Sequence, residues 1–371
     1  MTVFTEHRTT RWAVPAAAVV LIAGGTLVMS RTASADAGLP ARSAAQLLVD
    51  LRGAAGQSLS GTVVQTSNLG LPQIPGLTGQ GSGSPASTSG GASLTSVVSG
   101  THTWRVWAGG PTQSRVALVS GSGESDVIRN GADVWVWSSA EKSAVHHTLA
   151  AKDAGVASAP SATPTDLPKT PEEAAAKALA AIDPSTAVTT AGTAVVAGRS
   201  VYELVLDPRT DATRVAQVRI AVDAEKHVPL RVQVYSTKEA NPAVEVGFTS
   251  VDFAAPDARQ FAFSPPAGTT VTEGSANAAQ PPAGAKPTTE PKVVGTGWTS
   301  VVVATLPAQY ATAATQKQVQ SLLGSIPEVS GDWGSGRVVD GTLVSAVITD
   351  DGRIAVGAVD PAALYAALKA S

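Results

Sequence analysis

The hydrophobic pattern over the middle of the chain repeats every two residues, which is the period of β-strands. Between residues 97 and 263, apolar residues alternate with polar ones in many short runs separated by turn residues. The clearest pair of runs is 124–129 and 134–137, and Asn130-Gly131 between them is typical of a two-residue hairpin turn. The pattern predicts an α+β protein, mainly β, built on one large curved antiparallel sheet.

Two segments instead carry apolar residues at helical spacing. Residues 43–51 begin with Ser43 and Gln46, a capping-box pair, and residues 171–182 follow Thr170 as N-cap with Glu173 completing a second box. In the first segment, the positions i, i+3, i+4 and i+7 are occupied by Ala44, Leu47, Leu48 and Leu51. Both segments are expected to be helices that cover part of the sheet.

Composition divides the rest of the chain into domains and connections. Residues 70–96 are rich in Gly, Ser, Thr and Pro, so they lack the apolar bulk that offsets ordering entropy, and we expect a disordered insertion within a domain over 43–272. A linker rich in Pro, Ala and Gly is expected at 273–292. Residues 293–371 then predict a small α+β unit, with helices at 316–323 and 361–369, that docks on the main sheet because it is marginal alone.

The N-terminus has the pattern of an export segment. Two arginines precede residues 13–29, which are apolar and uncharged, and the small residues at 33–37 offer two overlapping A-x-A cleavage sites. The apolar run is shorter than the roughly 20 residues of a typical spanning helix. Residues 1–38 are therefore a signal peptide or a signal anchor. In either case we expect the chain to be exported, to the outer face of the cytoplasmic membrane or as a secreted protein.

Composition also excludes several kinds of chemistry. The chain has no cysteine, which excludes disulfides, thiolate metal sites and lipid attachment through cysteine. A net charge of −3 provides no basic surface for nucleic acid. The histidines lack zinc-ligand spacing; His146 and His147 are adjacent in a predicted strand and point to opposite faces. No nucleophile–base pair is recognisable, so we expect a non-enzyme without cofactor or metal.

The placement of aromatic residues points to an apolar binding face. Only 4% of the chain is aromatic, yet four of its seven tryptophans fall in two predicted strands. Trp135 and Trp137 share one face of their strand, while Val134 and Val136 make the other face apolar as well, so one face could line a cavity. Ordinary core packing is the alternative. The candidate lipid-binding residues are Trp104, Trp107, Trp135, Trp137, Tyr202 and Leu204.

Six short segments, taken in order, resemble a known superfamily. They lie at residues 59–65, 101–107, 129–137, 196–204, 229–232 and 246–251. Together they resemble the LolA/LolB/RseB superfamily of lipoprotein carriers and envelope sensors, which includes LolA-like outer-membrane lipoprotein carriers and MucB/RseB N-terminal-like domains. The likeness is strongest to actinobacterial-type members with one N-terminal membrane segment, and it covers about residues 43–272.

The resemblance implies a half-open barrel, closed by helices, that holds acyl chains of a lipid or lipoprotein without catalysis. A second reading implied by the same resemblance is an RseB-like sensor that binds the extracytoplasmic part of an anti-sigma factor. The membrane segment, the insertion and the C-terminal unit depart from the carriers of Gram-negative bacteria. These departures favour an anchored lipid- or lipoprotein-binding factor over a shuttle to an outer membrane.

Overall fold

The computed structural model describes residues 39–54, 56–70, 100–121, 123–149, 169–180, 182–274, 291–305 and 326–371. The predicted export segment, nearly all of the insertion at 70–96 and the helix predicted at 316–323 lie outside these residues. Within the described ranges, no helix has the length and apolar character needed to cross a membrane.

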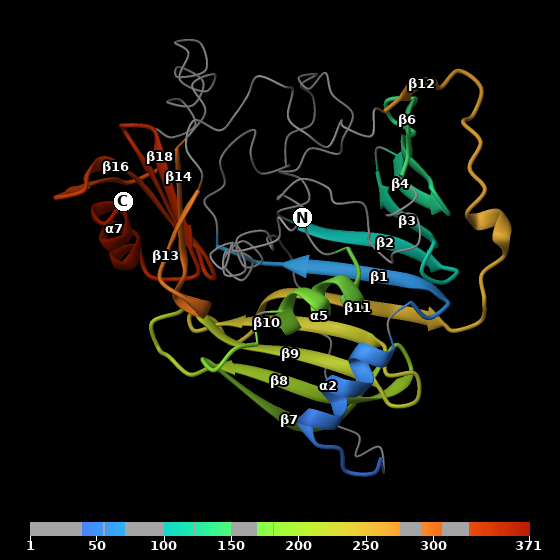
Figure 1. Cartoon of the computed structure of the whole chain (residues 1–371), viewed down its shortest axis with the longest axis horizontal. Helices are drawn as coiled ribbons and strands as arrows, with labels where there is room; N and C mark the ends of the chain where they lie inside the picture. The colour runs from blue at the N-terminus through green and yellow to red at the C-terminus, as the bar shows by residue number, and fades with distance from the viewer. Residues whose placement is uncertain are drawn as a thin grey trace, which may run out of the picture.

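A curved sheet of 12 strands dominates the fold (Figure 1). Its spatial order is β12-β6-β5-β4-β3-β2-β1-β11-β10-β9-β8-β7, and it does not close into a barrel. The strands are β1 (Leu59–Ser67), β2 (Gly100–Ala108), β3 (Gln113–Ser120), β4 (Gly123–Asn130), β5 (Asp133–Ser138), β6 (Ser143–Thr148), β7 (Thr186–Val196), β8 (Arg199–Pro208), β9 (Val215–Asp223), β10 (Pro229–Ser236), β11 (Pro242–Asp252) and β12 (Thr270–Glu273). The predicted mainly-β class and the half-open, curved antiparallel sheet are confirmed.

Two details of this sheet differ from the sequence prediction. The hairpin between β4 and β5 forms, but Asn130 pairs with Asp133, so its turn residues are Gly131 and Ala132. Gly131 has a φ of 64°, which explains why glycine occupies the first turn position. Glu273, predicted to begin the linker, instead ends β12, which runs parallel to β6.

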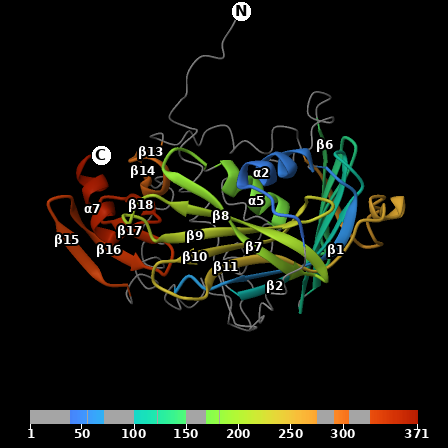
Figure 2. The same cartoon turned by 90° about the horizontal axis from the view of Figure 1, so that it is seen from below.

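Helices α2 (Ala44–Gly53) and α5 (Pro171–Ala180) lie on one side of the sheet (Figure 2). The predicted capping box of α2 is present: Gln46 N–H donates to Ser43 Oγ and Ser43 N–H donates to Gln46 Oε1, at 3.3 and 2.9 Å. At α5, Glu173 N–H donates to Thr170 Oγ1 at 3.1 Å. Both helices start where the caps predicted, because these side chains satisfy otherwise unpaired backbone N–H groups.

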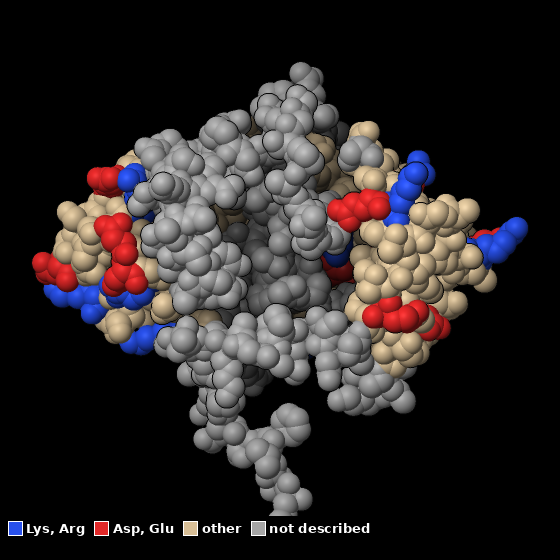
Figure 3. Space-filling view, turned by 90° about the horizontal axis from the view of Figure 1, so that it is seen from above, with Lys and Arg blue, Asp and Glu red and all other residues tan. Residues whose placement is uncertain are grey.

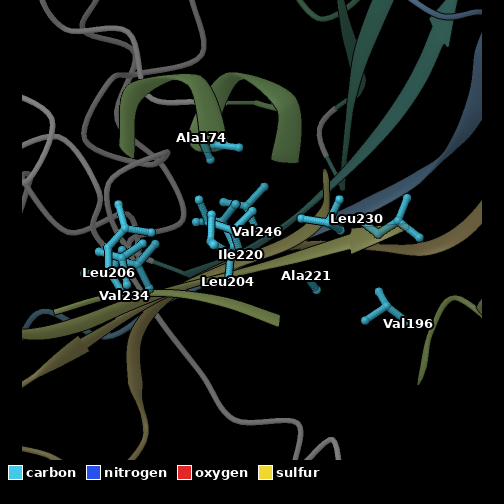
Figure 4. Close-up of a cluster of buried hydrophobic side chains, with 14 of the residues drawn as sticks. Ala174, Val196, Leu204, Leu206, Ile220, Ala221, Leu230, Val234 and Val246 are labelled. Carbon is cyan, nitrogen blue, oxygen red and sulfur yellow. The ribbon is translucent and has the colours of Figure 1, made fainter. Parts of the chain in front are cut away.

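The main core lies between these helices and the sheet. Leu204, Ile220, Val232 and Val246 are paired in register across β8, β9, β10 and β11, and each is at most 4% exposed. Figure 4 shows Ala174 of α5 above this cluster of aliphatic side chains. Since full burial of such a side chain contributes about 1.5–3 kcal/mol, this layer fixes the position of the helices on the sheet.

The C-terminal part forms a second sheet of six strands in the order β13-β14-β18-β17-β16-β15. Helix α7 (Pro361–Lys369) covers one of its faces and buries Leu364 and Leu368. The strands are β13 (Lys292–Val294), β14 (Val301–Thr305), β15 (Glu328–Gly331), β16 (Gly334–Asp340), β17 (Ser345–Thr349) and β18 (Arg353–Gly357). The predicted small α+β unit is confirmed.

Polar contacts join this unit to the ends of β9 and β10. The Arg214 side chain, 3% exposed, donates to Asp360 Oδ1 at 2.8 and 3.0 Å and to the Gly341 carbonyl at 2.6 Å. Its Nη2 atom also lies 2.5 Å from Asp340 Oδ1. Ser236 Oγ donates to the Thr342 carbonyl at 2.6 Å. The C-terminal unit therefore docks on the main sheet, as predicted.

Candidate functional site

The outer strands of the sheet, β2 to β6 with β12, form a wing beyond β1. In Figure 2 the wing stands on the side of the sheet where α2 and α5 lie, so that side is concave. Because side chains alternate along a strand, Trp104 and Val106 of β2 face the concave side, whereas Trp107 faces the convex side.

A single row of valines crosses the concave face of the wing. Each valine is paired in register with the next, one on each of five neighbouring strands: Val106, Val116, Val127, Val136 and Val145. The row spans about 19 Å, since neighbouring strands lie roughly 4.8 Å apart. Its inner end is buried beside the core, with Val106 6% exposed, and Val136 near its outer end is 38% exposed. Helices α2 and α5 pack mainly over β7, β10 and β11.

The rows on either side of the valines are more polar. On one side, the residues paired in register are Trp104, Leu118, Ser125, Ser138 and Ser143. On the other side they are Ser114, Arg129, Val134 and His147. On β5 and β6 the valines are therefore flanked by serines on one side and by Val134 and His147 on the other, and this narrow line suits one extended apolar chain better than a globular ligand.

The structure separates the six sequence-predicted lipid-binding residues. Trp104, Tyr202 and Leu204 are buried on the concave side at 5%, 6% and 0% exposure. Trp104 Nε1 donates to Gln65 Oε1 at 3.2 Å, and the Tyr202 hydroxyl donates to the Pro40 carbonyl at 2.8 Å. The other three, Trp107, Trp135 and Trp137, lie on the convex side. Strand alternation therefore places the six residues on two opposite faces, and a lipid contact by any one of them stays a prediction.

Two of the convex tryptophans, Trp135 and Trp137, contact the chain's own segment after β11. Trp135 stacks on His146 with ring centroids 4.3 Å apart, and Phe263 lies 5.3 Å from Trp135 and 5.9 Å from Trp137. Trp135 and Trp137 share a face, as predicted. On the opposite face of β5, Val136 is 38% exposed, whereas Val134 is buried. Sequence reasoning missed the valine row because each strand supplies one residue of it, and only the register aligns them.

On the convex face, Asp126 is a carboxylate whose pKa is strongly shifted. Its side chain is fully buried, 2.5 Å from Arg115 Nη2, and it is paired in register with Trp137. Burial raises the pKa of Asp126 to about 6; the Arg115 charge opposes the shift and Glu124 adds to it. Among the described residues, neither Asp126 Oδ1 nor Trp137 Nε1 has a hydrogen-bond partner. The ionised carboxylate is therefore costly to bury here.

Replacing Asp126 with asparagine is expected to stabilise the protein by about 1–3 kcal/mol near pH 7.5. The folded-state pKa of about 6 lies above the ordinary 3.8, so the wild type loses stability as pH rises from about 4 to above 6. The variant has no such loss. Urea unfolding of the wild type and the variant at about pH 5 and pH 7.5 measures both effects. A less stable Asp126→Asn protein at pH 7.5 would mean that the ion pair with Arg115 outweighs the burial cost.

The other candidate sites within the described ranges offer neither an unpaired cation nor a group that could bind a metal ion. A pocket of about 650 Å³ lies between α2 and the β7–β8 turn, lined by Arg42, Arg199 and Tyr202 among others. Its arginines are already paired, Arg42 with Asp50 and Arg199 with both Asp223 and Glu225, so the pocket offers no unneutralised cation. Figure 3 shows acidic and basic side chains in mixed order on this view of the molecule. No group of three or more His, Asp or Glu within the described ranges is placed to hold a metal ion.

Comparison with known proteins finds one family model that matches the central part of the chain. Residues 93–266 match the sequence model of the MucB/RseB N-terminal domain. A structure of Pseudomonas aeruginosa MucA/MucB aligns over 88% of this chain and 96% of that chain, with 16% identity and a TM-score of 0.42. A conserved protein from Thermus thermophilus aligns over 62% and 98%, with 12% identity and a TM-score of 0.33. A LolA superfamily protein from Nitrosomonas europaea aligns over 60% and 99%, with 11% identity and a TM-score of 0.24. No curated protein sequence matches the chain.

Proposed function

We propose that this chain, whose residues 93–266 match the MucB/RseB N-terminal domain, is a LolA/RseB-like, non-catalytic binding protein of the cell envelope. Its ligand is an acyl chain of a lipid or lipoprotein, held along the valine row of the wing. The single observation that carries this proposal is the register of Val106, Val116, Val127, Val136 and Val145, which forms an unbroken apolar line on a concave face.

The dimensions and the energetics of the row suit an acyl chain. A row of about 19 Å is comparable to a long, extended hydrocarbon tail. Burying such a tail gains about 0.8 kcal/mol per CH₂. A chain of roughly 16 carbons therefore gains about 12 kcal/mol when fully covered, before the costs of association. The row contacts only one side of the tail, so it supplies part of this gain in free energy. The more polar rows beside it favour a tail that lies along the valines.

The proposed location follows from the family and from the N-terminal sequence. Lipoprotein carriers and envelope sensors act in the cell envelope. Residues 13–29 have the apolar pattern of a signal peptide or anchor. We propose that the sheet domain and the C-terminal unit lie on the outer side of the cytoplasmic membrane. There an apolar row is useful, because free lipid tails are insoluble in the surrounding water.

A second candidate is a sensor that binds the extracytoplasmic part of an anti-sigma factor. The observation that favours it is the family match itself, which is to the MucB/RseB N-terminal domain. The two functions differ in what accompanies the purified protein. Extracted lipid in stoichiometric amount supports the acyl-chain function, and a stable membrane-protein partner with no extracted lipid supports the sensor.

Replacing Val136 with glutamine is expected to weaken binding of a fluorescent long-chain acyl probe about tenfold. The amide would lie in the middle of the apolar contact, and covering it without a hydrogen-bond partner costs about 1–3 kcal/mol. Val119→Gln is the matched control: Val119 is similarly exposed, at 40% against 38%, but lies on the convex face. Fluorescence titration measures affinity, and thermal unfolding checks that both variants keep the stability of the wild type.

Equal probe affinity in the Val136→Gln and Val119→Gln proteins would rule out the valine row as the acyl site. Equal weakening in both variants, accompanied by lower melting temperatures, would indicate damage to the sheet and would also count against the proposal. A wild-type protein that binds no acyl probe and yields no lipid leaves the sensor function as the better account.

A further inference from the structure

The segment that follows β11 forms a strap around the outside of the wing. It comprises residues 253–274, crosses the convex face and returns to the sheet as β12 beside β6, as the orange trace in Figure 1 shows. Phe261, 2% exposed, anchors its middle, and Phe263 contacts Trp135 and Trp137. The four residues before Gly274, which form β12, are all exposed. The strap is therefore firmly packed in the middle and weakly packed at its end.

His146 joins this exposed end of the strap to β5 through contacts with two carboxylates, which together we call the clasp. Its Nε2 atom lies 3.0 Å from Asp133 Oδ1 on β5, and its Nδ1 atom lies 2.9 Å from Glu273 Oε2 on β12. An ionised carboxylate only accepts hydrogen bonds, so both ring nitrogens must carry hydrogen and the ring is an imidazolium. The stacked Trp135 ring favours this cation as well. Loss of one proton removes one of the two carboxylate contacts.

The groups around His146 set the direction of its titration. Asp133 from β5 and Glu273 from β12 are the charged groups that act on it, the strap presents Phe263 to the same cluster, and His147 on β6 faces the concave side. Burial lowers the pKa of His146, but the hydrogen bonds and charges of the two carboxylates outweigh burial and raise it above the ordinary value. The clasp is therefore complete at mildly acidic pH and is lost as pH rises through this raised pKa.

Strand β12 is held only weakly on the edge of β6 that it covers. Its ends are held by backbone bonds, Thr270 N–H to the Lys142 carbonyl at 2.8 Å and Gly274 N–H to the His146 carbonyl at 2.7 Å. On the concave side it pairs Thr272 with Val145, so a threonine stands where the valine row would continue. A short exposed strand with no buried side chain contributes little, and an uncovered edge is a template for another strand.

We propose that the outer edge of β6 is a docking edge for an extended segment of a partner protein. The segment replaces β12 by adding a strand and presents a β-branched apolar residue beside Val145, which prolongs the valine row. Strand β12 covers the edge while His146 is protonated. When His146 loses a proton and a carboxylate contact is lost, the partner segment displaces β12 from the edge. This surface does not depend on acyl-chain binding, since it uses backbone groups and one side chain at the rim.

The probe is a synthetic peptide with the sequence of residues 268–274 carrying Thr272→Val and Glu273→Gln. The valine tests the predicted apolar contact, and the glutamine removes the peptide's own charged contact with His146, so only the clasp on β12 titrates. Binding to the isotope-labelled full chain is followed by NMR, from amide chemical shifts of β6, at about pH 5.5 and about pH 8. The Glu273→Lys protein, in which a lysine faces the imidazolium, serves as the open form.

We expect the peptide to bind the wild type at least about fivefold more tightly at the higher pH. The Glu273→Lys protein should bind it at both pH values, and a peptide carrying Thr272→Asp should bind more weakly to either protein. Shift changes should be centred on β6 and its neighbour β5. A Glu273→Lys protein that binds no peptide overturns the docking edge, and equal wild-type affinity at the two pH values overturns the clasp.

Discussion

Replacing Arg214 with alanine is expected to loosen the C-terminal unit from the main sheet and to destabilise the protein by about 2–3 kcal/mol. The guanidinium is 3% exposed and satisfies the Gly341 carbonyl, which loses its charged donor in the variant. Its two carboxylate partners, Asp340 and Asp360, are 49% and 77% exposed and can turn to water. The cost is therefore below that of breaking a fully buried ion pair.

Arg209→Ala is the matched control for this experiment, because Arg209 is an exposed arginine close to the same end of the sheet. Arg214→Lys should fall between the wild type and Arg214→Ala, since lysine keeps the charge but not the planar fork. Chemical unfolding gives the free energy, and limited proteolysis around residue 291 reports on docking. If the Arg214→Ala and Arg209→Ala proteins unfold alike, the Arg214 side chain does not contribute to holding the C-terminal unit on the main sheet.

Local signals in the sequence were enough to predict most elements of the main sheet. The period-two runs predicted strands, and the capping residues Ser43 and Thr170 predicted where both helices begin. The turn between β4 and β5 was predicted one residue early: both Asn130 and Gly131 favour positive φ, and only Gly131 has it. Such signals are local, because caps and turns depend on bonds between near neighbours in the chain.

Features that depend on distant partners could not be predicted in this way. Strand β12 has only four residues, and its pairing with β6 joins residues more than 120 positions apart. Alternation predicted that Trp135 and Trp137 share a face, but not that Phe263 covers it. The valine row likewise depends on four separate strand registers. A one-residue slip in any register would move part of the row to the convex face.

Replacing Trp104 with alanine is expected to cost about 3–5 kcal/mol of stability, the largest effect of any substitution considered. Trp104 is 5% exposed at the inner end of the wing, where it packs in the main core and pairs with Val63 and Leu118. Alanine would leave a cavity and would also leave Gln65 Oε1, on a side chain only 1% exposed, without the indole donor. Trp104→Phe keeps most of the volume and loses only the hydrogen bond, so its cost should be about 1–2 kcal/mol.

Trp135→Ala is the matched comparison, because Trp135 is only half-buried and lies on the convex face between His146 and Phe263. Its loss should cost less than the loss of Trp104, since water can reach part of the space that the ring leaves. Urea unfolding of the three variants ranks these costs, and acyl-probe titration of the Trp104→Phe protein separates stability from binding. Trp104→Phe should bind the probe as the wild type does if the ring fills the core. Probe affinity that falls in Trp104→Phe while stability is kept would instead make Trp104 part of the wall that contacts the ligand.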